Sequence, residues 1–352
     1  MALVRVLVMM GGPSNEHDVS LASGEMVFKA LAARPEMEVK ALTIGRDGQW
    51  RLADAPDHAW PKPGAAGGQV VPRAYAIDGV RLLAEADVAF LAFHGSFGED
   101  GTLQGLMEAM GLAYTGSGPL ASALAMNKAK AKEMLGLYGL AVPRAMQLSR
   151  RVLSQAMENS VAAVEANLPY PLVVKPNAGG SSVGVRLAPD REQLRAALED
   201  AAQYDLDVLV EEKLVGREMT CAVLEEFDGS VRALPVIEIV PKKGAFFDFA
   251  SKYEDAGADE ICPAQITDEE AAAIQQAAVR AHQALGCQGF SRTDMFLTAR
   301  GPVVLEVNTI PGMTPNSLLP KAARAAGIAF DALMAHLIEL ARLRQTRRLG
   351  KD

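Results

Sequence analysis

Residues 291–320 read SRTDMFLTARGPVVLEVNTIPGMTPNSLLP, and this stretch decides how the C-terminal half of the chain folds. Two apolar, β-branched segments flank a polar turn, a pattern that predicts a β-hairpin. We centre the turn on Arg300. Antiparallel pairing then sets two pairs of polar residues opposite each other, Asp294 with Glu306 and Arg292 with Asn308. Because side chains alternate between the faces of a strand, these four polar groups share one face of the hairpin.

This polar face predicts a metal site. Two carboxylates held side by side repel each other, and burying them is costly unless a cation lies between them. Carboxylate and amide oxygens suit a hard cation, Mg²⁺ or Mn²⁺, of the kind that also holds substrate phosphates. The alternative is a solvated hairpin face with an incidental salt bridge, and the hairpin alone leaves both open. The segment 308–312, NTIPG, predicts a turn, which favours a site at the end of the strand.

The composition is that of an ordinary globular protein. The chain has 352 residues, of which 49% are hydrophobic and 22% are charged. This length predicts two or three domains. The net charge of −8 argues against non-specific binding of nucleic acid, which requires a basic surface. The basic segment 342–348, RLRQTRR, predicts the solvated end of a helix, where cationic side chains are favourable.

The cysteines and the first residues favour the cytoplasm. Cys221, Cys262 and Cys287 are far apart and form no CxxC pair, which predicts neither a disulfide framework nor a zinc site and fits a reducing compartment. Residues 1–10 are apolar but few, and they include Arg5, so we expect a buried strand rather than a signal peptide. No run approaches the ~20 apolar residues of a membrane helix. We therefore expect a cytoplasmic protein with no membrane partner.

The N-terminal part alternates buried strands, glycine-rich loops and helices. We expect strands over 4–10, 38–44 and 87–93, and helices over 20–33 and 102–110. This alternation predicts a doubly wound α/β domain, whose ligands bind at the carboxyl ends of the strands. The Pro/Gly-rich stretch 55–72 predicts a surface excursion, to which we assign no function.

A different pattern follows. We expect helices over 120–137, 268–285 and 331–343, and buried strands over 171–176 and 207–212. Lys175 precedes a loop of small residues, 179–185, whose backbone N–H groups could close on phosphate oxygens while the lysine neutralises their charge. It is not a P-loop, because the lysine precedes the glycines. An ordinary Gly/Ser turn remains the alternative.

Glu211 and Glu218 bracket a charged loop after the strand at 207–212. A carboxylate at a strand end can accept a hydrogen bond from an adenine amino group, and another can hold a ribose hydroxyl. A merely solvated loop is the alternative.

Six motifs follow one another along the chain: GGPSNEHDVS (11–20), HGSFGEDG (94–101), KPNAGGSSVG (175–184), SRTD (291–294), EVNTIPGMT (306–314) and Ser317-Leu318. Each is weak evidence alone, but their order is specific. With them the chain resembles the ATP-grasp ligases, and within these the D-alanine–D-alanine ligase family. The resemblance implies an α/β fold: a Rossmann-like N-terminal domain over residues 1–119, then two α+β ATP-grasp subdomains over 120–212 and 213–352.

The resemblance also implies a reaction. ATP phosphorylates the carboxylate of one D-alanine, and the amine of a second attacks the acyl phosphate, giving D-alanyl-D-alanine, ADP and phosphate for peptidoglycan synthesis. Asp294, Glu306 and Asn308 would carry two Mg²⁺ or Mn²⁺ ions, and Arg292 would stabilise the tetrahedral oxyanion. The implied ATP-binding residues are Lys128 and Lys175 at the α- and β-phosphates, Gly180 and Ser182 in a flap over 180–184, Glu211, Glu218 and the backbone near Leu214 at adenine and ribose, and Lys252 at the γ-phosphate.

For the amino-acid substrates, the resemblance implies that Glu16 pairs with the ammonium group of the first D-alanine. His94 would lie near it, although a packed, hydrogen-bonded histidine is a close alternative. Ser317 and Leu318 would hold the carboxylate of the second substrate at a helix start. Gly312 would let the backbone approach the reaction centre.

The segment 250–253 resembles a mobile loop that closes over such sites and excludes water. Tyr253 would hydrogen-bond to Ser181 and Glu16, and a tyrosine there favours an amino acid over a hydroxy acid as second substrate. The alternatives are a ligase that uses D-serine or D-lactate as second substrate, and a catalytically silent ATP-binding regulatory module. We expect D-alanine and ATP as partners, and a homodimer.

Overall fold

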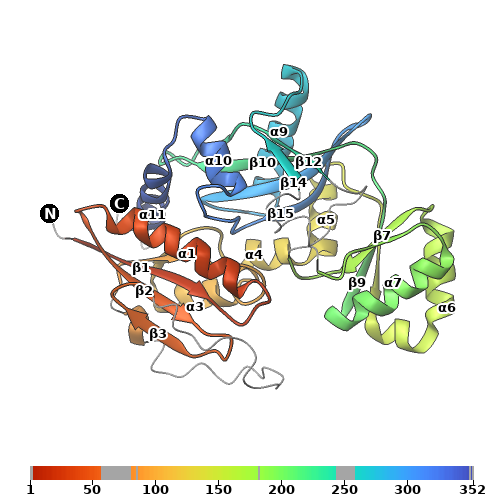
Figure 1. The fold of residues 1–352 in the computed structure, drawn as a ribbon, viewed down its shortest axis with the longest axis horizontal. Coiled ribbons are helices and arrows are strands. Elements are labelled where there is room, and N and C mark those ends of the chain that lie inside the picture. Colours follow the sequence, from red (N-terminus) through yellow and green to blue (C-terminus); the bar gives the residue numbers. More distant parts are fainter. Residues whose placement is uncertain are drawn as a thin grey trace.

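The structure is a computed structural model that describes residues 3–56, 81–84, 86–180, 183–242, 258–348 and 350. Within these ranges the chain forms three sheets with helices packed on them (Figure 1). The first sheet is largely parallel, whereas the second and third are antiparallel. The predicted α/β fold, with an N-terminal Rossmann-like part followed by two α+β parts, is confirmed.

The N-terminal sheet is doubly wound. Its strand order is β3-β2-β1-β4-β5, and only the edge strand β3 is antiparallel to its neighbour. Its elements are β1 (Val4–Gly11), α1 (His17–Ala32), β2 (Met37–Ile44), β3 (Trp50–Ala53), β4 (Val88–Leu91), α3 (Thr102–Met110) and β5 (Ala113–Tyr114). In β1, Val8 lies in the core that α1 covers, and Met9 lies in the core that α3 covers. A strand buried on both faces is what the apolar N-terminal run predicts.

Helix α11 (Phe330–Arg348) is last in sequence but packs on the first sheet (Figure 1). Leu333 of this helix shares a core with Val8 of β1. The basic end of α11 is the solvated tail that the sequence predicted only at its last residues, since Arg347 and Arg348 are exposed. Arg344 donates a hydrogen bond to the carbonyl oxygen of Gly116 at 2.9 Å, and burial lowers the pKa of its guanidinium group. For Arg344 the prediction was wrong, because this turn of the helix lies against a loop that offers a carbonyl acceptor.

The central part forms a separate lobe around an antiparallel sheet of order β6-β9-β7-β8 (Figure 1). Its elements are β6 (Ala145–Ser149), α6 (Arg150–Asn167), β7 (Leu172–Pro176), β8 (Arg186–Ala188), α7 (Arg191–Tyr204) and β9 (Asp207–Glu212). Helices α6 and α7 share one core with the sheet. Strand β7, which carries Lys175, is paired with β8 on one side and β9 on the other, so its backbone is held in place.

The helix predicted over 120–137 is in fact two helices, α4 (Pro119–Met126) and α5 (Lys128–Leu137). Asn127 separates them in an extended conformation (φ −84°, ψ 95°), and its side chain accepts a hydrogen bond from the N–H of Lys130. Asparagine is a favourable N-cap residue, so the chain ends one helix and starts another. The break places Lys128 at the start of α5, beside the cavity described below.

The C-terminal sheet has the order β13-β12-β10-β14-β15, with β11 paired to β10. Its elements are β10 (Arg217–Glu225), β11 (Val231–Ala233), β12 (Ile237–Pro241), β13 (Ala258–Ile261), α9 (Asp268–Ala284), β14 (Phe290–Thr298), β15 (Gly301–Asn308) and α10 (Leu318–Ala325). Helices α4, α5 and α9 pack on one face, and α10 packs on the other. None of the helices in the described ranges is long and apolar enough to cross a membrane.

His282, on α9, makes the stability of this part sensitive to acid. Its Nδ1 shares a hydrogen bond of 2.8 Å with Ser291 Oγ, and burial, reinforced by the charge of Arg344, lowers the pKa of His282 to about 4. In the unfolded chain His282 takes up a proton near pH 6.5, whereas in the folded protein it does so only near pH 4. The neutral, buried His282 therefore contributes its full stabilisation above pH 6.5, and this contribution is lost as the pH falls towards 4.

We predict that His282→Gln flattens this dependence. Between pH 7 and 4.5 the wild type should lose about 2 to 3 kcal/mol of unfolding free energy more than the variant, whose baseline stability is lower. Urea unfolding at several pH values measures this difference. Parallel pH profiles for the two proteins would show that His282 does not carry the effect.

Candidate active site

Two cavities meet between the sheets. One, of about 600 Å³, lies between the central and C-terminal sheets. The other, of about 260 Å³, extends from there towards the N-terminal domain. They share Lys128, Glu218, Asp294 and Glu306 as lining residues. A large and a small ligand can therefore meet at these carboxylates.

The β14–β15 hairpin confirms the predicted pairing. Asp294 lies opposite Glu306, and Arg292 lies opposite Asn308. Since all four are partly buried, the polar face is not merely solvated. The carboxylate pair lies at the junction of the two cavities.

The route to this pairing differs from the prediction. The turn is not centred on Arg300, because Thr298 pairs with Gly301 and leaves a two-residue loop. The register then shifts after Asp294, and Leu305 becomes an extra residue on β15. This β-bulge moves the pairing by one residue and so restores the expected opposition.

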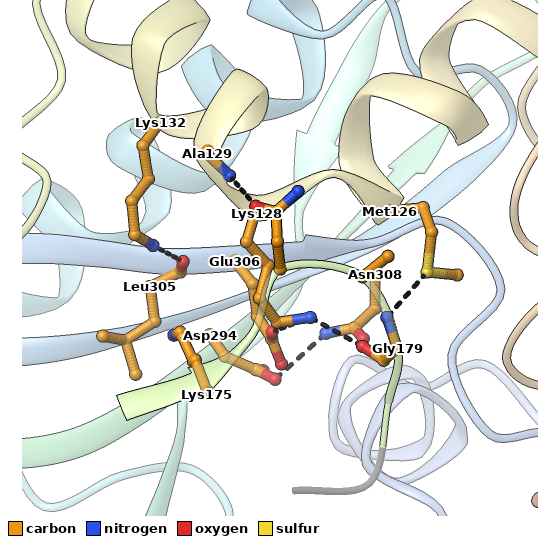
Figure 2. A network of polar contacts seen from close by, with 12 residues as sticks. Met126, Lys128, Ala129, Lys132, Lys175, Gly179, Asp294, Leu305, Glu306 and Asn308 are labelled. Atoms are coloured by element: carbon orange, nitrogen blue, oxygen red, sulfur yellow. Dashed lines mark hydrogen bonds and ion pairs between the residues drawn. The ribbon is translucent and has the colours of Figure 1, made fainter. Parts of the chain in front are cut away.

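Asp294 is held in place by surrounding donors. Arg292 binds it with a guanidinium fork, Nε to Oδ1 at 2.8 Å and Nη2 to Oδ2 at 2.7 Å, and Thr220 Oγ donates to Oδ1 at 2.6 Å. Asn308 Nδ2 donates to Asp294 Oδ2 at 3.0 Å (Figure 2). This orientation leaves the side-chain carbonyl oxygen of Asn308, Oδ1, available as a ligand. Burial alone would lower the pKa of Arg292, but the charge of Asp294 outweighs it and raises that pKa.

Lys128 links the glycine loop to the carboxylate face. Its Nζ donates to the carbonyl oxygen of Gly179 at 2.6 Å and lies 3.4 Å from Glu306 Oε2 (Figure 2). A cation placed between a flap and a carboxylate is well located to meet a phosphate. Lys128 lines both cavities, which is compatible with the predicted phosphate contact.

Glu211 is not at an open strand end, as the sequence suggested, but buried between two lysines. Its Oε2 lies 2.8 Å from Lys175 Nζ, and its Oε1 lies 3.0 Å from Lys132 Nζ. Burial would raise the pKa of Glu211, but the charges of Lys175 and Lys132 outweigh burial and lower it. Oε1 is buried against the Lys132 ammonium, whereas Lys175, the partner of Oε2, lines the larger cavity.

Two further predicted ATP residues line the larger cavity. Leu214 lies in the segment between β9 and β10, and Glu218, near the start of β10, lines both cavities. Gly180 also lines both. The position of all three is compatible with the nucleotide contacts that the sequence implied.

Glu16 reaches the smaller cavity from the N-terminal domain. It is the N-cap residue of α1, but its side chain makes no cap hydrogen bond. Its carboxylate lies so close to the glycine loop that a Cβ on Gly180 would be 2.5 Å from Oε2. Glycine leaves room for this carboxylate, which comes from a motif far away in sequence.

His94 lines the same cavity and is also a packed, hydrogen-bonded histidine. Its Nε2 shares a hydrogen bond of 3.0 Å with Ser23 Oγ. Burial, with the charge of Arg292, lowers the pKa of His94 to about 4, so the ring is neutral at pH 7. Both interpretations of this residue are thus compatible with the geometry.

The opposite end of the smaller cavity is the start of α10. Ser317 and Leu318 line it, and Ser317 is the N-cap residue without a side-chain cap bond. Its Oγ instead shares a hydrogen bond of 2.8 Å with Thr314 Oγ1. A Cβ on Gly312 would lie 2.8 Å from that Oγ, so a larger residue there would have to displace the Ser317 side chain.

Four predicted site residues lie outside the described residues: Ser181, Ser182, Lys252 and Tyr253. Their roles remain predictions. The 55–72 stretch also lies mostly outside the described ranges.

Sequence reasoning missed two residues. Glu99 lines the smaller cavity, and burial, with the charge of Glu16, raises the pKa of Glu99 to about 8, so it is neutral at pH 7. Lys132 lies one helical turn after Lys128, and that i, i+4 spacing was the signal that could have found it. Glu99 stands in a motif that was noted, but nothing in the motif distinguishes it from a solvated glutamate.

Two cavities of different size meet at a pair of carboxylates, and lysines line the larger one. This is the arrangement expected of an ATP-grasp ligase, the class that the sequence motifs implied. Comparison with known families then identifies the particular one. Residues 5–117 match the model described as D-ala D-ala ligase N-terminus, and residues 134–339 match D-ala D-ala ligase C-terminus. The chain belongs to the D-alanine–D-alanine ligase family and is an enzyme of the ligase class.

Individual relatives agree with this assignment. A D-alanine–D-alanine ligase of Syntrophobacter fumaroxidans is 42% identical over 340 residues, covering 96% of this chain and 97% of the relative. The Bacillus anthracis D-alanine–D-alanine ligase complexed with ATP superposes with a TM-score of 0.76 at 31% identity, covering 99% and 100% of the two chains. The VanG D-Ala:D-Ser ligase of Enterococcus faecalis superposes with a TM-score of 0.78 at 34% identity, covering 96% and 99%.

Proposed function

We propose that this ligase joins two D-alanines at the junction of its two cavities, with ATP in the larger cavity and the amino acids in the smaller. The observation that carries this proposal is that Asp294, Glu306 and Lys128 line both cavities. A phosphate bound there would lie against an amino-acid carboxylate. The products are D-alanyl-D-alanine, ADP and phosphate, and the dipeptide serves peptidoglycan synthesis.

ATP would occupy the cavity of about 600 Å³. Lys128 and Lys175 line it, and they would bind the α- and β-phosphates. Glu211 would accept a hydrogen bond from the adenine amino group, near Leu214, and Glu218 would hold the ribose. Gly180, Ser182 and Lys252 are proposed to close over the phosphates.

Two Mg²⁺ or Mn²⁺ ions fit the residues present. Asp294 and Glu306 face each other across the hairpin, and Asn308 offers its carbonyl oxygen because its amide nitrogen is engaged by Asp294. An all-oxygen set of this kind suits hard divalent cations. When bound, the ions would neutralise phosphate charge and hold the γ-phosphoryl group for transfer.

The reaction then proceeds in two steps, phosphoryl transfer and amide-bond formation, and side chains of the site would stabilise the negative charge in each. In the first, a carboxylate oxygen of D-alanine forms a bond to the γ-phosphorus and the bond to the ADP oxygen breaks. In the second, the amine of the other D-alanine bonds to the acyl carbon and loses a proton, the tetrahedral oxyanion collapses, and phosphate leaves. Arg292 would donate to that oxyanion, beside Gly312 at the reaction centre. Tyr253 and Ser181 would complete this site with Glu16.

The amino acids would bind at the two ends of the smaller cavity. Glu16 would pair with the ammonium group of the first D-alanine, with neutral His94 beside it. Ser317 and Leu318 would receive the carboxylate of the second at the start of α10, where backbone N–H groups and the helix dipole favour an anion.

We predict that Glu16→Gln raises the KM for the first D-alanine by about tenfold or more, because a charge-assisted contact to an ammonium group is lost. The KM for ATP should change little, since Glu16 does not line the larger cavity. Initial-rate kinetics at varied D-alanine and fixed ATP measure the effect. Asp18→Asn, an exposed change on the same helix, is the control, and equal kinetics for both variants would remove Glu16 from the site.

One alternative is a ligase that takes D-serine or D-lactate as second substrate, since a D-Ala:D-Ser ligase is among the structural relatives. Phosphate release with each acceptor separates these possibilities. We expect D-alanine to be preferred, and a strong preference for D-lactate at neutral pH would contradict the proposal. The other alternative, a silent ATP-binding module, has no need of the arginine fork on Asp294.

We further propose that the enzyme acts in the cytoplasm, where ATP is available, and that it is a homodimer. We propose no membrane partner and no nucleic-acid partner. The net charge of −8 supports the second of these, because nucleic-acid binding requires a basic surface. Light scattering of the purified protein would test the dimer.

A further inference from the structure

Lys132 is a buried lysine directly behind the wall of the larger cavity. It extends from α5, and its side chain is only 5% exposed. Its Nζ lies 3.0 Å from Glu211 Oε1 of β9 and donates a hydrogen bond to the carbonyl oxygen of Leu305 on β15 (Figure 2). One ammonium group thus joins a helix to both ATP-grasp sheets.

The cluster holds more positive charge than its carboxylate needs. Glu211 pairs with both Lys132 and Lys175, so two ammonium groups share one carboxylate in a place where side chains are at most 10% exposed. Burying a charge is costly unless it is paired, and one lysine would be enough to pair Glu211. The charge of Glu306 also favours the charged form of Lys132, so this second cation serves more than the pairing of Glu211.

The two lysines differ in their access to the cavity. Lys175 lines it, whereas Lys132 is not among the described residues that line either cavity. A phosphate entering the cavity can reach Lys175 but not Lys132. If Lys175 turns from Glu211 to a phosphate, Lys132 remains to balance the carboxylate.

The second contact of Lys132 falls on the β-bulge. Leu305 is the extra residue of β15, so its carbonyl oxygen lies outside the regular pairing of the hairpin. Lys132 supplies a donor to that oxygen. The next residue is Glu306, one of the two facing carboxylates, and its direction depends on how the bulge is held.

We propose that Lys132 is a positioning residue of the nucleotide site. It keeps the charge of Glu211 balanced when Lys175 turns to the phosphates, and it fixes the backbone from which Glu306 extends. This inference rests on the proposed function, because it assumes that ATP occupies the larger cavity. It adds a residue that neither touches the nucleotide nor lines its cavity.

The test compares Lys132→Met with Lys130→Met in the full-length protein, with ATP and Mg²⁺ as the probe. Lys130 lies on the same helix but is exposed and paired with Glu133, so its loss controls for the change of residue type. We expect Lys132→Met to raise the Kd of ATP at least about tenfold and the KM of D-alanine less than about twofold. An ATP affinity equal to that of Lys130→Met would overturn the proposal.

A second variant separates positioning from simple destabilisation. Lys132→Met leaves Glu211 paired with Lys175 and should lower the Tm. Adding Glu211→Gln removes the charge that Lys132 balances when Lys175 turns to the phosphates, so the loss of Lys132 should then have little further effect on ATP affinity. Compared with Glu211→Gln alone, the double variant should bind ATP less than about threefold more weakly. A full tenfold loss in that background would show that Lys132 does not act through Glu211.

These outcomes are distinct from failure of the proposed function. If the wild type does not bind ATP, the assignment of the larger cavity is wrong. If the wild type binds ATP and Lys132→Met binds it equally well, only the role of Lys132 is wrong.

Discussion

Arg292→Ala should lower the turnover number by about 100-fold or more, while the Kd of ATP stays within several-fold of the wild type. A donor aimed at a developing oxyanion typically contributes that much to the rate and little to ground-state binding. The guanidinium group lies on the same hairpin face as the carboxylates of Asp294 and Glu306 and is held by a two-point contact with Asp294. Initial rates of phosphate release and an ATP titration measure the two quantities.

Two further variants make this result specific. Arg292→Lys keeps the charge but loses the fork, so it should recover only part of the rate. Arg300 lies in the turn of the same hairpin, and its side chain is 72% exposed. The Arg300→Ala variant should therefore retain the wild-type rate. Activity of Arg292→Ala above about a tenth of the wild type would count against the oxyanion role.

Glu306→Gln should likewise lower turnover by about 100-fold or more, since metal ions contribute several kcal/mol to such transfers. The change keeps the shape of the side chain but removes one of two carboxylates that face each other across the hairpin. The concentration of Mn²⁺ that gives half-maximal activity should also rise. ADP release measured at increasing Mn²⁺ reports both effects.

Glu133→Gln is the matched control, because Glu133 is exposed on α5 and pairs with Lys130. It should leave both quantities unchanged. If Glu306→Gln required no more Mn²⁺ than the wild type and kept its rate, Glu306 would not be a metal ligand.

Much of the fold follows from local sequence pattern. The apolar run at 4–10 is a strand buried on both faces, and the opposition of Asp294 and Glu306 was predictable from alternation along a hairpin. The turn and bulge were not, because their shifts of one residue cancel and leave no trace in the polar pattern. The break at Asn127 carried a local signal, a cap residue within a helical pattern, that the apolar periodicity outweighed.

The sequence-based predictions that failed most clearly concern residues whose surroundings are set by tertiary contacts. Arg344 of α11 resembles part of a solvated tail until the loop that accepts its hydrogen bond is in place. Glu211 looked like a strand-end carboxylate, and only the fold shows two lysines around it. The raised pKa of Glu99 requires burial beside Glu16, which comes from another motif far away in sequence.

The most direct test of the account is to measure ADP and D-alanyl-D-alanine in the same reaction, with D-alanine, with L-alanine and without an amino acid. The account predicts equal amounts of ADP and dipeptide with D-alanine, and only background ADP in the other two. ADP formation that is independent of D-alanine, or that yields no dipeptide, would contradict it.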